Sequence, residues 1–292
     1  MNGTDGKHGR LGPDSASWRL MRERIVILGG MRALLMQSAH PSIAAAAERT
    51  GKYERDPWGR LDRTLRLTFM LTFGTREEIT SAARQINRTH RAIHGTDDRT
   101  GLRYSAADQD LILWVHASLV SSFLLFERAG VGEFDAGDRQ LFHQEMTATS
   151  TLLGLDAAST PPTVAALDEY VRSVLTGGTL RATTGSRTLK ALMAAEGIDL
   201  RYPMSAVARY LAFHTLPTEL RELYAVAHTD RDSVTVACLF AALRNGRRLL
   251  PRSRRYTDTA NAAYARLGGV KVDLAGVPVL PARRHEAPHG DR

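Results

Sequence analysis

The stretch that decides the fold is Tyr104 to Gly130, YSAADQDLILWVHASLVSSFLLFERAG. Ser105 and Asp108 form an S-x-x-D pattern, in which a hydroxyl and a carboxylate satisfy the free amides of a first helical turn. From Leu111 to Phe126 the residues are apolar on nearly every face of such a helix. A helix that is hydrophobic all round belongs inside a domain. The stretch therefore predicts a buried central helix over 105–129.

His116 lies at the centre of this apolar stretch. Burial disfavours the charged imidazolium and leaves a neutral ring with one donor and one acceptor nitrogen, which is also the form that binds metals. The residues alone leave two interpretations open. The ring is either a core histidine that is hydrogen-bonded to its neighbours, or a ligand to a metal ion or to haem iron.

The rest of the chain also follows helical spacing, with apolar residues three or four apart and breaks at Pro and Gly. We expect helices over 16–27, 29–49, 57–73, 75–94, 105–129, 137–153, 163–175, 187–196, 203–214, 217–227, 231–248 and 252–267. Only residues 270–280, VKVDLAGVPVL, have a strand-like pattern. The sequence therefore predicts one compact all-α domain over 15–268, between a disordered tail at 1–14 and an extended tail at 269–292.

The composition excludes disorder of the whole chain, because 43% of its 292 residues are hydrophobic. The net charge is +8, and a net charge affects solubility and non-specific contacts but does not indicate a fold. Six arginines surround Pro251, and these are Arg244, Arg247, Arg248, Arg252, Arg254 and Arg255. The cluster has no interleaved aromatic residue apart from Tyr256 and no DNA-reading motif accompanies it. A solvated face is therefore favoured over a lipid or nucleic-acid contact, and we expect no specific nucleic-acid partner.

Several classes of protein are disfavoured by what the sequence lacks. Cys238 is its only cysteine, which leaves no intrachain disulfide and no cysteine-based zinc site. G-x-G-x-x-G, P-loop and G-x-S-x-G motifs are missing, which argues against the usual nicotinamide, nucleotide and serine-hydrolase enzymes. The N-terminus has no apolar signal-peptide core, and no stretch approaches 18 uninterrupted apolar residues. We expect a cytoplasmic protein, with peripheral membrane contact left open.

A second informative stretch is Arg84 to Gly95, RQINRTHRAIHG. Three arginines share one side of a helix at spacing i, i+4, i+7, and these are Arg84, Arg88 and Arg91. His90 and His94 share another side, four residues apart, before the helix ends at the glycine. Such a pair can bind zinc, but no HExxH motif accompanies it. A solvated basic face is favoured, and the alternative is a set of donors that line a pocket for an anion, dioxygen or haem propionates.

A third stretch is Met31 to Ala47, MRALLMQSAHPSIAAAA. Pro41 removes a backbone amide and pushes His40 away from the helical region, so the pattern predicts a helix break between them. The alanines that follow allow either another helix or a flat ligand to approach closely. Tight helix packing is the favoured account.

Taken together, five segments resemble a known family of helical proteins: LLMQSAHPSIAAA, DPWGRLDRTL at 56–65, FGTREE at 73–78, RQINRTHRAIHG, and YSAADQDLILWVHASLV. The family unites latex-clearing rubber oxygenases, the ER-bound oxygenase of mycophenolic acid biosynthesis and many uncharacterised actinobacterial proteins. The resemblance spans roughly residues 20 to 265 and is strongest for the small bacterial branch.

The resemblance implies a globin-like, all-α core that holds haem b and cleaves an isoprenoid carbon–carbon double bond with dioxygen. It also implies that His116, in the W-V-H-A position, is the proximal iron ligand. On the same basis His40, Arg84 and Arg88 are expected to help bind the cofactor. Arg84, Arg88 and His90 are expected to act in catalysis, by stabilising negative charge that develops on dioxygen. The apolar small-molecule substrate is expected in a tunnel lined by residues such as Phe69, Met70, Phe123 and Phe126.

The sequence also departs from the family pattern. Latex-clearing proteins carry Arg-x-x-Lys-Thr on the distal side, where the lysine is able to cap the iron. The local counterpart is Arg88-Thr89, and none of the four lysines falls nearby. The sixth iron position would then go to His90, to water, or stay open. The missing lysine keeps an alternative open, a non-catalytic helical protein that binds haem or an apolar ligand; a further alternative is a non-haem metal protein that uses His90 and His94.

Overall fold

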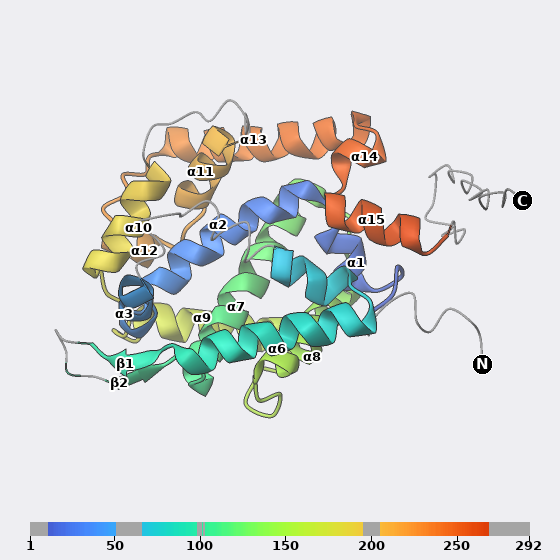
Figure 1. Cartoon of the computed structure of the whole chain (residues 1–292). Helices are drawn as coiled ribbons and strands as arrows, with labels where there is room; N and C mark the ends of the chain where they lie inside the picture. Colours follow the sequence, from blue (N-terminus) through green and yellow to red (C-terminus); the bar gives the residue numbers. More distant parts are fainter. Residues whose placement is uncertain (1–10, 51–65, 98–100, 102, 195–204, 269–292) are drawn as a thin grey trace, which may run out of the picture.

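The chain folds as a set of helices packed around one central helix, as seen in a computed structural model that describes residues 11–50, 66–97, 101, 103–194 and 205–268 (Figure 1). Residues 66–73 are also helical. The labelled helices are α1 (Ala16–Met21), α2 (Arg24–Ser38), α3 (Pro41–Thr50), α6 (Arg76–Ala92), α7 (Gln109–Phe126), the π-helical turn η1 (Glu127–Val131), α8 (Ala136–Ser150), the 3₁₀ turn η2 (Thr151–Leu153), α9 (Val164–Thr176), α10 (Thr184–Ala194), α11 (Ser205–His214), α12 (Thr218–Leu223), α13 (Asp230–Leu249), α14 (Arg252–Arg255) and α15 (Asp258–Arg266).

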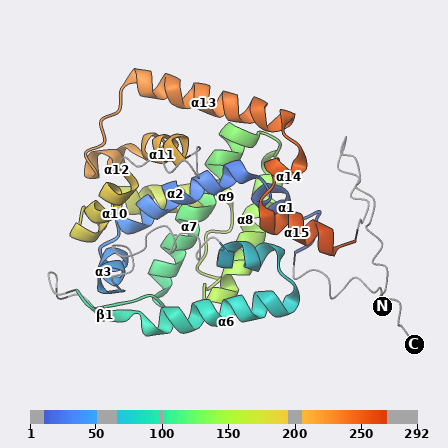
Figure 2. The ribbon, with the colours of Figure 1, turned by 45° about the horizontal axis from the view of Figure 1, so that its top comes forward.

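The central helix is α7, the helix expected from the apolar stretch. It packs against α2, α8 and α9, and both views place it between α6 on one side of the molecule and α13 on the other (Figures 1 and 2). By length and composition alone, Gln109–Val131 is the one helix of the described residues that could cross a membrane. More than half of its most apolar window is buried inside the fold, as expected of a core helix.

The crossing of α2 and α7 forms the centre of this core, and a glycine permits their close approach. A Cβ atom on Gly29 would lie 3.1 Å from the carbonyl oxygen of Ser122 and 3.2 Å from the ring of Phe126. Three residues further along α2, the buried Arg32 donates a hydrogen bond to the Ser122 hydroxyl at 2.7 Å and another to the Thr215 carbonyl at 2.9 Å. The close approach at Gly29 and the Arg32–Ser122 bond hold α2 and α7 at a fixed separation, and the bond to Thr215 joins α2 to the residue that follows α11.

The start of α7 differs from the sequence prediction. Asp108, not Ser105, is the N-cap residue, and the helix begins at Gln109. Ser105 instead ends the strand β2 (Arg103–Ser105), which pairs antiparallel with β1 (His94–Thr96). The S-x-x-D pair is still hydrogen-bonded, because the Ser105 amide donates to the Asp108 carboxylate at 2.9 Å. It closes the turn between strand and helix instead of the first turn of the helix.

Several predicted helices are divided or shortened. The helix expected over 252–267 is divided into α14 and α15, and the one expected over 217–227 is shortened to α12. The helix expected over 16–27 is broken before Glu23, which is buried and caps α2. The break predicted at His40-Pro41 is confirmed, since α2 ends at Ser38 and α3 begins at Pro41. The helix expected over 75–94 ends at Ala92, because the chain turns there into the hairpin.

Half of the basic cluster around Pro251 is not solvated but bound into the fold. Arg255 donates to the buried carboxylate of Glu23 at 2.5 Å, and Arg247, itself 5% exposed, lies 3.3 Å from the same carboxylate. Arg244 donates to the Ala129 carbonyl at 3.1 Å. A buried carboxylate requires such partners, because an unpaired buried charge is costly. These arginines therefore join α13 and α14 to the start of α2 and to η1.

The predicted all-α class is confirmed by these elements. The globin-like arrangement of the core stays a prediction, as does the division into a domain over 15–268 and two tails. The strand-like segment 270–280 and residues 57–65 of one predicted helix lie outside the described residues.

Candidate functional site

The site is centred on His116, in the middle of α7. Its side chain is 3% exposed, and its neighbours on the helix include the buried residues Leu113, Trp114 and Val120. An imidazole that is buried among apolar side chains must find its partners on another element. For His116 that element is α8.

One face of α8 carries three polar side chains at spacing i, i+4, i+7, which places them in a row opposite α7. The Ser150 hydroxyl lies 3.0 Å from Nδ1 of His116. The Thr147 hydroxyl lies 3.3 Å from its Nε2. The third member, His143, places its ring 5.9 Å from the ring of His116, measured between centroids. These three residues were not predicted from the sequence, although their spacing on a helix was a usable signal.

Burial sets the protonation state of His116. Desolvation, with a smaller contribution from the nearby His143, lowers the pKa of His116 to about 4. The ring is therefore neutral near pH 7, with a lone pair on one of its nitrogens. A neutral, buried imidazole is the form that ligates a metal or haem iron.

His143 is equally buried, and one of its nitrogens has no partner among the described residues. Its Nε2 lies 2.7 Å from the carbonyl oxygen of Pro161. A carbonyl only accepts hydrogen bonds, so this nitrogen carries a proton and donates it to Pro161. Nδ1 of His143 is buried without a partner, and so is Nε1 of Trp114 on α7.

His90 is half-buried and lies, with Ile86 and Asn87, on the side of the Arg84–Gly95 stretch that faces the fold. It continues the buried face of α6, which includes Ile79 and Ala83. Desolvation lowers the pKa of His90, and its Nδ1 is buried without a partner among the described residues. One turn before it, Asn87 donates to the Leu152 carbonyl at 2.8 Å. That bond joins α6 to η2, the turn that directly follows Ser150.

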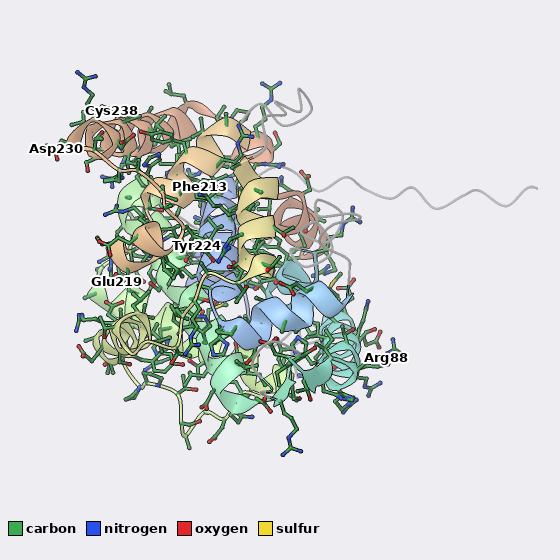
Figure 3. All side chains as sticks on the ribbon, turned by 90° about the vertical axis from the view of Figure 1, so that its left-hand side faces the viewer. Arg88, Phe213, Glu219, Tyr224, Asp230 and Cys238 are labelled. Atoms are coloured by element: carbon green, nitrogen blue, oxygen red, sulfur yellow. The ribbon has the colours of Figure 1, made fainter. Side chains whose placement is uncertain are left out.

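The two arginines predicted for the site have exposed side chains. Arg84 and Arg88 lie on the side of α6 that faces solvent, and Figure 3 shows Arg88 at the edge of the molecule. No hydrogen bond or ion pair of the described residues joins either of them to His116. The favoured interpretation of these arginines, a solvated basic face, agrees with this placement. Their role as donors in the site stays a prediction with no contact to support it.

The histidine pair His90 and His94 is not formed as predicted. The helix ends at Ala92, so His94 lies on β1 with an exposed side chain, and the two residues do not share a helix face. The spacing of four residues is meaningful only within a continuous helix. A metal site built on this helical pair is therefore not supported.

His40 lies at the break between α2 and α3. Desolvation lowers its pKa, and the charge of Asp110 at the start of α7 acts in the opposite direction. Its Nδ1 is buried without a partner among the described residues. His40, His90, Trp114 and His143 thus each bury a ring nitrogen that no described residue satisfies, although buried polar atoms normally have partners.

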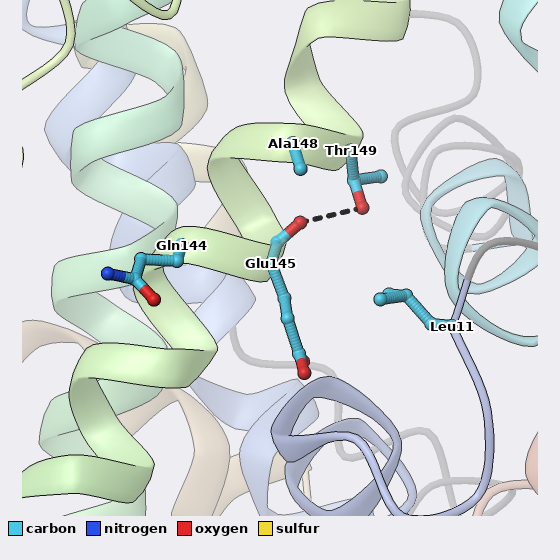
Figure 4. A pocket seen from close by; sticks show the side chains of 5 residues that line it. All are labelled: Leu11, Gln144, Glu145, Ala148 and Thr149. Atoms are coloured by element: carbon cyan, nitrogen blue, oxygen red, sulfur yellow. Dashed lines mark hydrogen bonds between the residues drawn. The ribbon is translucent and has the colours of Figure 1, made fainter.

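The described residues form a pocket of about 260 Å³ on the other side of α8, lined by Leu11, Gln144, Glu145, Ala148 and Thr149 (Figure 4). Its volume is below the range of about 300 to 1,000 Å³ that is typical of ligand sites. Its lining does not include His116. Phe123 and Phe126, expected in a substrate tunnel, are buried in the core, where the ring of Phe126 packs against Phe240 at 5.2 Å.

The chemistry of the donors fits haem iron, with one rearrangement. His116 supplies a neutral ring, and Ser150 holds its Nδ1, as a partner on the second nitrogen of a ligating histidine does. The same ring has the Thr147 hydroxyl on Nε2, so ligation through Nε2 requires Thr147 to give up this contact. The partnerless Nδ1 of His143, whose ring lies 5.9 Å from that of His116, is the kind of group that a polar cofactor edge or ordered water satisfies.

Comparison with known proteins agrees with the resemblance seen in the sequence. Neither the curated proteins nor the solved structures contain a significant match to this chain. A family model described as ER-bound oxygenase mpaB/B'/rubber oxygenase, catalytic domain, matches residues 18–245, which is well over half of the chain. Such a family implies, in general terms, dioxygen, an apolar substrate and a metal or haem type of cofactor. The chain therefore belongs to the family of the ER-bound oxygenase mpaB/B'/rubber oxygenase catalytic domain.

Proposed function

We propose that this protein is a haem b-dependent oxygenase that acts with dioxygen on a hydrophobic, isoprenoid-like alkene, with His116 as the proximal iron ligand. Membership of an oxygenase family supports the reaction class. The observation that carries the assignment to this residue is the environment of His116, a neutral ring that is 3% exposed and has Nδ1 held by Ser150 at 3.0 Å. Haem would supply the activation of dioxygen, which no protein side chain provides.

Within this proposal, α8 orients the ligand. Ser150 fixes the ring plane of His116 through Nδ1 and leaves Nε2 for the iron. Thr147 is the side chain that must move or rotate, and its hydroxyl can turn to a backbone carbonyl of its own helix. His143 is held beside the site by the bond from its Nε2 to the Pro161 carbonyl.

The other side chains of the site would exclude water and supply a hydrogen-bond donor. The apolar faces of α7 keep the surroundings of His116 dry, which strengthens any electrostatic interaction there. His90 is the inward-facing candidate for a donor beside dioxygen, and His40 for a contact to the cofactor. On the sequence alone we also propose a cytoplasmic location, with peripheral membrane contact left open.

Uptake of dioxygen tests the proposed reaction. The protein loaded with haem is mixed with a polyprenyl alkene in an oxygen electrode, and products are analysed by mass spectrometry with ¹⁸O-labelled dioxygen. Cleavage of one double bond would consume one dioxygen and place one labelled oxygen in each of two carbonyl products. Loaded protein that binds the alkene without consuming dioxygen would contradict the oxygenase assignment and support a binding protein instead.

A further inference from the structure

A second cluster of metal-binding side chains lies away from His116, where α11 meets the start of α13. His214 is the last residue of α11, His228 precedes α13, and Asp232 lies in the first turn of α13. The Nδ1 atoms of the two histidines are 3.1 Å apart. Nε2 of His214 is 3.9 Å from Oδ1 of Asp232. One ligand atom from each of the three residues lies within 4.8 Å of the others.

Each of these three side chains is held by a further contact. The Tyr210 hydroxyl donates to Oδ1 of Asp232 at 2.7 Å, and the Tyr210 ring lies 4.2 Å from the His214 ring. Nε2 of His228 is 2.9 Å from the Ser233 hydroxyl. Metal ligands in proteins are commonly oriented in this way, by hydrogen bonds from residues that do not touch the ion.

The carboxylate of Asp232 is held in place from two sides. It accepts hydrogen bonds from the Thr229 amide and the Thr229 hydroxyl, both at 2.7 Å, and from the Tyr210 hydroxyl at 2.7 Å. The imidazole of His214 and the carboxylate beside it offer a nitrogen and an oxygen as ligands.

We infer that His214, His228 and Asp232 form a binding site for a divalent transition-metal ion of the zinc class, with water at the fourth position. Two imidazoles and one carboxylate are a ligand set typical of zinc, whereas magnesium and calcium prefer oxygen ligands alone. Ligands at about 2.1 Å from a tetrahedral ion are about 3.4 Å from one another. The Nδ1 atoms of the two histidines, 3.1 Å apart, are already near this spacing. One ligand atom of each of the three residues lies within 4.8 Å of the others, so the Asp232 carboxylate has to approach by about 1 Å.

The ion would join two helices that are separated along the chain by the segment containing α12. Figure 3 shows Phe213, the neighbour of His214, and Asp230, the first residue of α13, on the same side of the molecule. Binding would hold the start of α13 against the end of α11 and raise the unfolding temperature of the protein. This site is independent of the proposed haem chemistry.

Zinc titration of the full chain, purified and then treated with a chelator, tests the inference. Isothermal calorimetry is expected to give one saturable site in the unaltered protein. His214→Ala and His228→Ala are expected to lose it, while Tyr210→Phe weakens it about 10-fold through the lost bond to Asp232. His94→Ala and the double variant His285→Ala, His289→Ala are the controls for exposed and tail histidines, and both are expected to keep the site.

Zinc-edge X-ray absorption supplies a readout that haem iron does not affect. Two imidazole nitrogens per zinc are expected in the unaltered protein, and no bound zinc is expected in His228→Gln, a substitution at a partly exposed position. Circular dichroism checks that this variant keeps its fold. The inference is overturned if the unaltered protein shows no saturable zinc binding. It is equally overturned if both histidine variants bind zinc as the unaltered protein does, since the 3.1 Å contact is then only a hydrogen bond between the rings.

Discussion

Nδ1 of His116 lies 3.0 Å from the hydroxyl of Ser150, and this contact joins the central helix α7 to the last turn of α8. It leaves Nε2 as the nitrogen through which the ring could bind iron. Thr147 holds that second nitrogen at 3.3 Å. In the proposed site the Ser150 hydroxyl therefore supports iron binding, whereas the Thr147 hydroxyl competes with it. Substituting each residue separately distinguishes these two roles.

Ser150→Ala is expected to weaken haem binding by about 10- to 100-fold, the usual cost of removing the partner of a ligating histidine. Thr147→Val is the matched control on the same helix face, since it keeps the volume of the side chain but removes its hydroxyl. It is expected to bind haem at least as tightly as the unaltered protein, because Nε2 no longer has a competing contact. Spectrophotometric haem titration measures both affinities, and equal weakening by the two substitutions would contradict the opposite roles of Ser150 and Thr147.

The stability of the haem-free protein is expected to depend on pH through His116. The folded-state pKa is lowered to about 4, so the unfolded chain binds the proton more readily at pH values between this value and the ordinary one near 6.5. The contribution of the neutral ring to the free energy of unfolding is therefore fully present above about pH 6.5, and it is lost as the pH falls toward 4. It amounts to about 3 kcal/mol in the free energy of unfolding.

Urea unfolding at about pH 7.5 and about pH 4.5 checks this dependence. His116→Gln is expected to reduce the difference in unfolding free energy between the two pH values by about 2 kcal/mol, since glutamine does not titrate. His94→Gln, at an exposed position, is expected to leave the difference unchanged. An unchanged difference in His116→Gln would mean that the ring is protonated in the folded state at low pH without cost.

His90→Ala and Arg88→Ala test which residue of α6 acts in the site. His90 faces inward, and its replacement is expected to slow dioxygen uptake by about 100-fold or more, the scale for losing one oriented donor. The sequence alone predicts the same effect for Arg88, but its side chain is exposed, and we expect its replacement to change the rate less than about twofold. A 100-fold loss in Arg88→Ala, with His90→Ala unaffected, would reverse these roles.

Gly29→Ala tests the crossing of α2 and α7. The added Cβ would meet the Ser122 carbonyl oxygen at 3.1 Å and the Phe126 ring at 3.2 Å, so the helices must separate slightly. We expect a loss of about 1 to 3 kcal/mol in the free energy of unfolding, the cost of overpacking a core. Gly246→Ala, in α13 with no atom within 4 Å, is expected to stabilise the protein by about 0.5 to 1 kcal/mol. Denaturant unfolding of the two variants measures both changes.

The sequence predicted the elements whose signals are local. The apolar run of α7, the break at His40-Pro41 and the all-α class all depend on neighbouring residues, and each is confirmed. Ser105 failed as a helix start because an S-x-x-D pair also closes a turn after a strand. Ser105 belongs to a strand instead of a helix because His94 of β1 pairs with it, and this pairing is not visible in the sequence around Ser105.

The candidate site was predicted only in part, because its contacts join elements that are far apart in the sequence. The central position of His116 followed from α7 alone, whereas its partners Thr147 and Ser150 come from α8. The exposure of Arg88 and the inward direction of His90 depend on which face of α6 packs against the fold. Likewise, the sequence around Arg247 and Arg255 indicates a solvated face. In the fold both side chains contact the buried carboxylate of Glu23, which lies more than 200 residues earlier in the chain and is not part of the local pattern.

The absorption spectrum of the purified protein reports whether haem is bound and whether His116 holds its iron. The protein is expressed in cells supplied with iron and a haem precursor, and spectra are recorded before and after reduction with dithionite, for the unaltered chain and for His116→Ala. The account predicts a stoichiometric Soret band that shifts on reduction in the unaltered protein, and its loss or displacement in the variant. A colourless folded protein, or an unchanged spectrum with full haem occupancy in His116→Ala, would contradict it.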